Sequence, residues 1–265
     1  MKATAPIFVG LCADDYFLPG ALKKVVDAWQ QSDYKPGLMT FNWKARQVKH
    51  DPLMKFSYEQ LPHALDGTDA ALAFFLFGCL PGNFSEVSGR LPVVVPEHYL
   101  YDVKFSADYE YWMRISKMHG VEFNDTDVVY VRRHDKVAAT YMVTKGEYHE
   151  ESIRIYENII NDLSPYYDRK KLIAYYNIGV CSFHLRLALM SALKGKFTAL
   201  KSFFRLQSPV FWPKGFQFLG CLPFALSKGL RFKVCILLSK SFLSVGKKAT
   251  VGSRSAQMAS QSSIA

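Results

Sequence analysis

Cysteine is scarce in this sequence and follows no pattern: five residues are scattered over 265 positions, and no two of them form a C-x-x-C pair. This spacing excludes a disulfide framework and a zinc-ribbon site. It predicts free thiols in a reducing compartment, and therefore a chain in the cytosol or facing it. The first residues also lack the basic region, long apolar run and small-residue cleavage site of a secretory signal, so no signal peptide is predicted.

Acidic residues are missing from the last third of the chain. All 23 Asp and Glu residues lie at or before Asp168, together with 17 of the 33 Lys and Arg residues, which gives residues 1–168 a net charge of −6. Residues 169–265 carry the other 16 basic residues and no acid, a net charge of +16. Such a sharp boundary predicts two regions with different partners, the second of which binds an anionic surface.

Long apolar runs are lacking as well. A membrane-spanning helix needs about 20 mostly apolar residues, but residues 172–193 include His184 and Arg186, and the charge-free run 215–227 contains a proline. Around that run, aromatic rings alternate with Lys and Arg, a pattern typical of segments in the headgroup region of an anionic membrane surface. The alternative is a cationic helical face packed on the domain or on a partner. Nucleic acid is a weaker third option that we do not expect, because no recognition motif accompanies the pattern.

Short apolar segments alternate with helical patterns in the first half, which predicts an α/β fold. We expect strands at residues 6–13, 37–48, 93–95 and 127–134, and helices at residues 20–31, 69–77 and 106–120. Helical spacing of Leu22, Val25, Val26 and Trp29 marks the first helix. Later helices are expected at residues 145–163, 168–194, 197–206 and 216–243, the last broken by Pro and Gly. The regions predicted are an α/β part (1–142), a basic helical part associated with the membrane surface (143–246) and a disordered tail (247–265).

Three groups of polar residues stand at the ends of these elements. Asp14 and Asp15 follow the first strand, where open α/β sheets bind ligands, and paired carboxylates suit Mg²⁺ or Mn²⁺; the simpler interpretation is that they cap a turn. Asp108 in the first turn of a helix is a candidate general base or only a partner of the helix dipole. Arg133 and His134 after a strand are candidates for a diphosphate clamp and a metal ligand, or a solvated strand end.

The order and spacing of these groups resemble family-2 glycosyltransferases of the GT-A fold. LCADDYFLPGAL (residues 11–22) looks like their acidic metal motif, and FSADYEYWMRISKMHG (105–120) looks like their acceptor-side motif. VVYVRRHDKVAATY (128–141) is similar to the strand and loop that follow, and LPGNFSEVSGR (80–90) resembles the segment that enters the acceptor site. The likeness covers about residues 7–141.

The resemblance implies a partial GT-A, Rossmann-like mixed sheet followed by the basic helical region. It implies transfer of a sugar from a nucleotide-sugar donor to a glycan or lipid-linked acceptor in surface polysaccharide synthesis. Carried over by position, Asp15 and His134 ligate Mg²⁺ or Mn²⁺, Asp14 binds ribose or metal, and Arg133 holds the diphosphate. Asp108 deprotonates the acceptor hydroxyl in a single inverting displacement. The expected location is peripheral, on the cytoplasmic face of the membrane.

Two features depart from the family pattern. Cys12 stands where the family usually has Asn or Asp. Family members also carry a first half-sheet, with the aspartate that binds the nucleotide base, before the acidic motif, which here begins at Asp14. The resemblance therefore implies a chain without that half, with an exposed sheet edge that a complementing N-terminal chain or a second copy would cover. The alternative to a working enzyme is an inactive remnant that acts as a membrane- or protein-interaction module.

Overall fold

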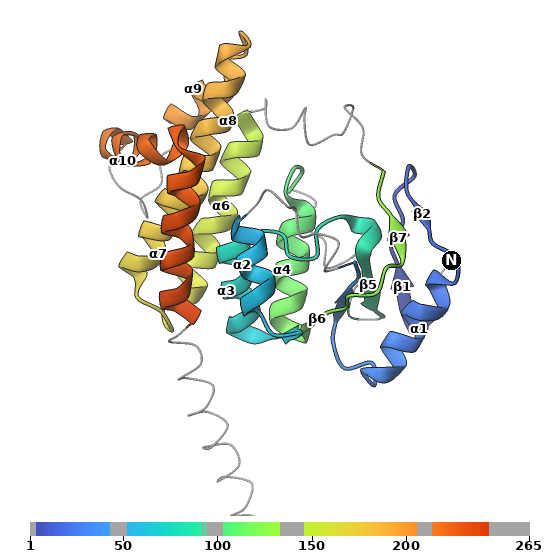
Figure 1. Cartoon of the computed structure of the whole chain (residues 1–265). Coiled ribbons are helices and arrows are strands. Elements are labelled where there is room, and N and C mark those ends of the chain that lie inside the picture. The colour runs from blue at the N-terminus through green and yellow to red at the C-terminus, as the bar shows by residue number, and fades with distance from the viewer. Residues whose placement is uncertain are drawn as a thin grey trace, which may run out of the picture.

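The computed structural model describes residues 4–42, 52–91, 93, 103–132, 146–205 and 214–243 (Figure 1). Its helices are, in chain order, α1 (Ala21–Gln31), α2 (Pro52–Gln60), α3 (Gly67–Phe77), α4 (Ala107–His119), α6 (Gly146–Leu163), α7 (Arg169–Tyr175), α8 (Ser182–Leu193), α9 (Thr198–Arg205), α10 (Lys214–Leu226) and a last helix over residues 228–243. Figure 1 shows the strands and α1 on one side of the molecule, α6 to α10 on the other, and α2, α3 and α4 between them.

The strands form one mixed sheet and one small ribbon. The sheet has the order β1 (Ile7–Val9), β5 (Val87–Arg90), β3 (Leu38–Thr40), β6 (Val121–Phe123) and β4 (Ala64–Leu65). β3 and β6 run parallel, and the other neighbouring pairs are antiparallel. Among the described strands, β1 lies at one edge of the sheet and β4 at the other. A separate two-stranded ribbon pairs β2 (Tyr16–Phe17) with β7 (Val129–Tyr130). The α/β prediction is confirmed at this level, with a mixed sheet.

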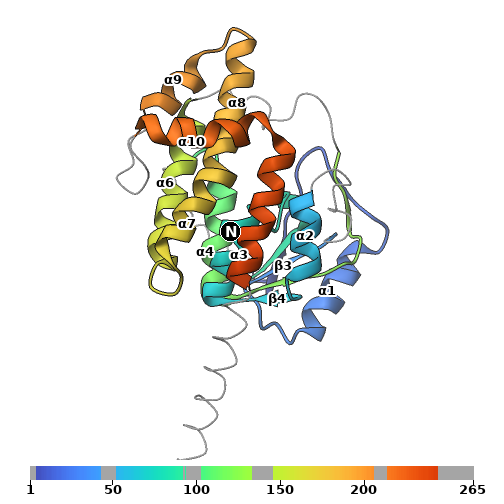
Figure 2. The ribbon, with the colours of Figure 1, turned by 60° about the vertical axis from the view of Figure 1, so that its left-hand side comes forward.

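Helix α3 joins the two sides of the molecule. Every residue from Ala70 to Phe77 is buried, as expected for a helix that is apolar on all faces and is therefore surrounded by protein. It packs on α4 and on α6. One continuous hydrophobic core, from Leu38 in β3 to Phe242 in the last helix, includes these elements. Figure 2 shows that last helix running alongside α2 and α3.

Helix α1 covers a second, smaller core. Val25 and Trp29 are fully buried there, and the Trp29 indole N–H donates to Ser88 Oγ at 2.9 Å. The helix forms where spacing predicts it, but Leu22 and Val26 are 54% and 40% exposed. Only one side of α1 packs on the sheet. Leu22 and Val26 each follow a buried residue by one position, which places them on the neighbouring, solvent-exposed side of the helix.

The basic C-terminal part is helical, as predicted. α7, the π-helical segment η3 (Tyr176–Cys181) and α8 form one continuous helix, Arg169–Leu193. Among the described helices it is the one long and apolar enough to cross a membrane by length and composition, yet 56% of its most apolar window is buried inside the protein. The break in the last predicted helix falls at Ser227, while Pro223 lies inside α10.

The observed strands are shorter than the predicted ones. β3 covers three residues of the segment predicted at 37–48, and β7 covers two of the segment predicted at 127–134. Parts of the predicted elements lie outside the described residues, namely 43–48, 94–95, 133–134 and the tail 247–265. The strands are short, at two to four residues each.

Candidate functional site

The two adjacent carboxylates after β1 lie in different surroundings. Asp14 is exposed, whereas Asp15 is buried. The Asp15 carboxylate accepts hydrogen bonds from Ser85 Oγ at 2.5 Å and from the backbone N–H of Arg132 at 2.9 Å. Asp15 therefore ties the β1–β2 loop to the segment before β5 and to the chain after β7. Its role as a metal ligand stays a prediction, and these two hydrogen bonds leave it fewer lone pairs for a cation.

Ser85, which the sequence analysis did not single out, holds this corner together. Its hydroxyl donates to Asp15 and accepts from the backbone N–H of Cys12 at 2.7 Å. It sits in the short helix η1 (Phe84–Glu86), which a capping box fixes: Asn83 Oδ1 accepts from Ser85 N–H, and Glu86 Oε2 accepts from Asn83 N–H. The Asn-x-x-Glu spacing is a sequence signal for such a turn.

Phe84 of the same segment connects the acidic loop to α4. Its ring lies 6.1 Å from Trp112 of α4 and 6.4 Å from Phe8 of β1, between ring centroids. Gly10 is required beside it, because a Cβ atom there would lie 2.4 Å from the Phe84 carbonyl oxygen. Figure 1 shows the β1–β2 loop and the start of α4 toward the same end of the molecule, the upper one in that view.

Asp108 lies in the first turn of α4, as predicted, and lines a cavity of about 710 Å³. The residue as a whole is exposed to solvent, although it contributes to the cavity wall. Its Oδ1 accepts from the backbone N–H of Tyr109 at 2.8 Å. The pKa of the Asp108 carboxyl is raised above its ordinary value, chiefly because the cavity wall displaces water, and backbone hydrogen bonds lower it by less. A carboxyl group with a raised pKa in a cavity is a candidate proton acceptor.

Glu151 of α6 fixes the chain that leads into α4. Its buried carboxylate accepts three backbone hydrogen bonds, from Lys104 at 2.6 Å, Phe105 at 2.8 Å and Ser106 at 2.5 Å. No local motif in the sequence indicates this role of Glu151, because its partners lie about 45 positions away. Through these bonds, α6 of the basic helical part positions the turn that carries Asp108.

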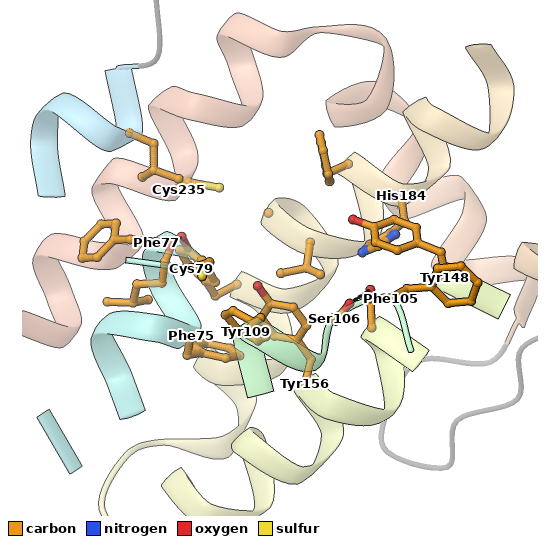
Figure 3. A pocket seen from close by; sticks show the side chains of 18 of the residues that line it. Phe75, Phe77, Cys79, Phe105, Ser106, Tyr109, Tyr148, Tyr156, His184 and Cys235 are labelled. Atoms are coloured by element: carbon orange, nitrogen blue, oxygen red, sulfur yellow. Dashed lines mark hydrogen bonds between the residues drawn. The ribbon is translucent and has the colours of Figure 1, made fainter. Parts of the chain in front are cut away.

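The cavity lies between the middle helices and the C-terminal ones (Figure 3). Its wall is mostly aromatic and apolar, and includes Phe75, Phe77, Cys79, Phe105, Tyr109, Tyr148, Tyr156, Tyr175, Phe183, Phe232 and Cys235. In Figure 3, Cys79 and Cys235 lie at one end, and Ser106 and Tyr148 at the other. The lining, as far as the structure describes it, does not include Asp14 or Asp15. The structure therefore places the two predicted sites at the same end of the molecule but not in one cavity.

A buried histidine pair includes His184, which lines the cavity, and His149 behind it in α6. Nδ1 of His149 in α6 and Nδ1 of His184 in α8 lie 2.8 Å apart, so one ring donates and the other accepts. Burial, and secondly the neighbouring His149, lower the pKa of His184 to about 3. His184 therefore stays neutral at pH 7, and the hydrogen bond between the two rings is kept.

This pair predicts that stability falls with acid. Above pH 6.5 His184 is neutral in both the folded and the unfolded chain; between pH 6.5 and about 3 only the unfolded chain binds the proton. The free energy of unfolding should then decrease by up to about 1.4 kcal/mol per pH unit on acidification. Urea unfolding at pH 7.5 and 5.5 measures the slope, and His184→Gln should flatten it. An unchanged slope in His184→Gln would contradict this assignment.

Arg133 and His134 lie outside the described residues, so their predicted roles stay predictions. Within the described ranges, no group of three or more His, Cys, Asp or Glu side chains is arranged to hold a metal ion. Mg²⁺ often binds through one or two carboxylates together with substrate phosphates. Exposed Asp14 can supply one such carboxylate, whereas both carboxylate oxygens of buried Asp15 already accept hydrogen bonds.

Comparison with models of protein families, with curated proteins and with solved structures finds no match to this chain.

Proposed function

We propose that this protein is a glycosyltransferase that resembles family 2, with a GT-A-like sheet, and transfers a sugar from a nucleotide-sugar donor to a hydroxyl group of an acceptor. The observation that carries the proposal is Asp108, a carboxyl with a raised pKa at the start of α4, in a cavity of about 710 Å³. The acidic loop after the edge strand β1, held by Asp15 and Ser85, supports a donor site at the same end of the molecule.

Asp108 is the general base of the proposed reaction. In its ionised form it accepts the proton of the acceptor hydroxyl while that oxygen forms a bond to the anomeric carbon of the donor sugar. The bond from that carbon to the diphosphate breaks on the opposite face, so the configuration inverts and a nucleoside diphosphate leaves. Glu151 holds the turn before Asp108 and so orients the base. Orientation of this kind contributes much of an enzyme's rate enhancement.

Exposed Asp14 and buried Asp15 have separate roles in the proposal. Asp14 faces solvent and is the carboxylate that would hold Mg²⁺ or Mn²⁺ with the donor diphosphate, while Asp15 positions the loop. The family resemblance implies that Asp15 ligates the cation and that Asp14 binds ribose or metal, so the proposal moves the principal metal-ligand role from Asp15 to Asp14. The cation, when bound, would supply positive charge that stabilises the departing diphosphate. Arg133 and His134 are proposed to add to that charge.

The C-terminal helices are proposed to lie on an anionic membrane surface, on its cytoplasmic face. Leu193, at the end of α8, is 83% exposed, and Leu226 and Leu237 are 68% and 65% exposed. They stand among basic residues, in a part of the chain that has no acidic residue. Apolar side chains bordered by Lys and Arg are the composition that binds the headgroup region of anionic lipid.

Binding of a nucleoside diphosphate with Mn²⁺ tests the proposal. Titration calorimetry with UDP, GDP, ADP and CDP should detect one that binds only with Mn²⁺ present. Asp14→Ala should weaken that binding by more than about tenfold. Loss of a residue that only hydrogen-bonds to a metal ligand typically lowers metal affinity by about 10–100-fold, and loss of the ligand itself should cost at least as much. Asp27→Ala, an exposed acid of α1 paired with Lys23, is the matched control.

The exposed apolar and basic helices also favour a second candidate, a non-catalytic membrane-interaction module. It predicts binding to vesicles containing phosphatidylglycerol and no metal-dependent binding of any nucleoside diphosphate. Single-stranded DNA binding that falls steeply with salt and persists in Asp14→Ala and Asp108→Ala would instead indicate a nucleic-acid partner. Vesicle binding with no nucleotide binding would overturn the proposed enzymatic function.

A further inference from the structure

The cavity beside Asp108 is built for an apolar ligand. Its volume of about 710 Å³ falls within the roughly 300–1,000 Å³ typical of small-molecule sites. Two tyrosine hydroxyls of the wall already donate to backbone carbonyl groups of α3. Tyr109 Oη donates to the Phe74 carbonyl at 3.0 Å, and Tyr175 Oη donates to the Leu76 carbonyl. A ligand that enters here meets mostly carbon.

The titratable groups of the wall away from the α4 turn are mostly neutral near pH 7. Burial raises the pKa of the Cys235 thiol to about 11, and that of the Tyr156 hydroxyl to about 12. His184 is neutral for the reason given above. Charged side chains of the wall are Lys104 and Asp108 at the α4 turn, and Arg231, whose guanidinium lies 5.2 Å and 5.0 Å from the ring centroids of Phe183 and Phe232.

The cavity therefore has a polar end and an apolar end. Ser106 and Tyr148 lie at the end near the α4 turn, and Phe77, Cys79 and Cys235 lie at the other (Figure 3). Burial raises the pKa of Tyr148, a hydrogen bond with Ser152 lowers it, and the charge of Asp108 adds a smaller increase. A matching ligand has a hydroxylated head and an apolar chain.

The last helix connects this cavity to the outer surface. Its inner face gives Arg231, Phe232 and Cys235 to the cavity wall, and its outer face exposes Leu237 and Lys233. A helix that presents apolar side chains to the cavity and Leu237 to solvent is suited to a protein that takes a lipid from a bilayer, because apolar groups on both faces can contact acyl chains.

We propose that this cavity holds the apolar chain of an amphiphilic lipid acceptor, with its hydroxylated head at Asp108. The position of the head as acceptor rests on the proposed transferase function. The binding of the chain does not, because it depends only on the cavity. Of the two acceptor classes that the resemblance allows, a soluble glycan and a lipid-linked one, the cavity selects the lipid-linked class.

Binding of dodecyl glucoside to the full chain, without nucleotide and below the critical micelle concentration, tests the proposal. We expect saturable binding of one molecule with a negative heat-capacity change, the mark of apolar burial, and no binding of methyl glucoside. Dodecyl phosphate is the second probe. Its affinity relative to dodecyl glucoside distinguishes a lipid phosphate from a neutral glycolipid, and binding of either supports the proposal.

Filling the cavity locates the site. Cys235→Phe places a ring in the cavity. It should weaken the binding of dodecyl glucoside at least about tenfold, because two or more methylene groups of the dodecyl chain are no longer buried. Val26→Phe puts the same ring at an exposed position of α1, on the other side of the molecule from the C-terminal helices, and should leave the affinity unchanged. Cys79, in the segment that follows α3, lies at the same end of the cavity. Cys79→Phe therefore replaces Cys235→Phe as the test if that variant does not fold.

Equal affinity in the cavity-filling variants and the wild-type chain, or no saturable binding of either dodecyl probe, would overturn the proposal. Dodecyl binding without any metal-dependent nucleotide binding would leave the cavity assignment intact and remove the transferase. Metal-dependent nucleotide binding without binding of either dodecyl probe would support the transferase and remove the cavity assignment.

Discussion

Replacing Asp108 with asparagine should lower the turnover number of sugar transfer by about 10²–10⁴-fold, the range that general bases contribute. Asparagine has nearly the same shape, and its oxygen still accepts from the Tyr109 N–H, but it cannot take a proton from the acceptor hydroxyl. The donor is a nucleotide sugar that contains the nucleoside diphosphate found to bind, and dodecyl glucoside is the acceptor. The rate at which the nucleoside diphosphate is released measures the effect. The affinity for the nucleoside diphosphate should stay unchanged.

The same base predicts how the rate depends on pH. Because the ionised carboxylate is the active form, the rate should rise with pH through the raised pKa of Asp108 and then level off. Asp162→Asn removes an exposed carboxylate that pairs with Lys117, away from the cavity, and should retain full activity. Retention of more than about a tenth of wild-type turnover in Asp108→Asn would remove this residue from the role of base.

Glu151→Ala should lower the free energy of unfolding by about 3 kcal/mol, because three backbone N–H groups of residues 104–106 lose a charged acceptor. The loss also frees the turn before α4 from α6, so activity should fall with stability. Urea unfolding at pH 7.5 measures the change. Glu150→Ala, at the exposed neighbouring position of the same helix, should alter stability by no more than about 0.5 kcal/mol.

Glu151→Gln separates the hydrogen bonds from the charge. The amide oxygen can still accept from Phe105 and Ser106, but the amide nitrogen cannot accept from Lys104, so stability should fall below that of the wild-type chain but less than in Glu151→Ala. Equal stability of Glu151→Ala and Glu150→Ala would show that water replaces the carboxylate at no cost, and that α6 does not position Asp108.

The helices were predictable because their signals are local. α4 begins after Ser106 and ends at Gly120, whose positive φ of 79° favours glycine, and the apolar spacing between them gives the buried face. The apolar run at residues 69–77 likewise predicts α3. Such signals act over a few residues and need no knowledge of distant contacts.

The site was only partly predictable, for the opposite reason. Asp108 could be found from its place in a helical first turn, but its cavity is completed by residues of the last helix, more than 100 positions later. Ser85 and Glu151 act through partners about 45 to 73 positions away. No periodicity or spacing in one sequence carries that information, since each of these contacts depends on tertiary packing.

The wall of the cavity draws on residues from Leu53 to Cys235, so its environment is complete only when nearly the whole chain is present. During synthesis, Asp108 leaves the ribosome long before the last helix, so the cavity beside it is incomplete until that helix docks. A nascent or prematurely terminated chain would carry Asp108 next to an unfinished cavity. In the proposed transferase, the order in which the polypeptide emerges would therefore delay formation of the acceptor site until translation is nearly complete.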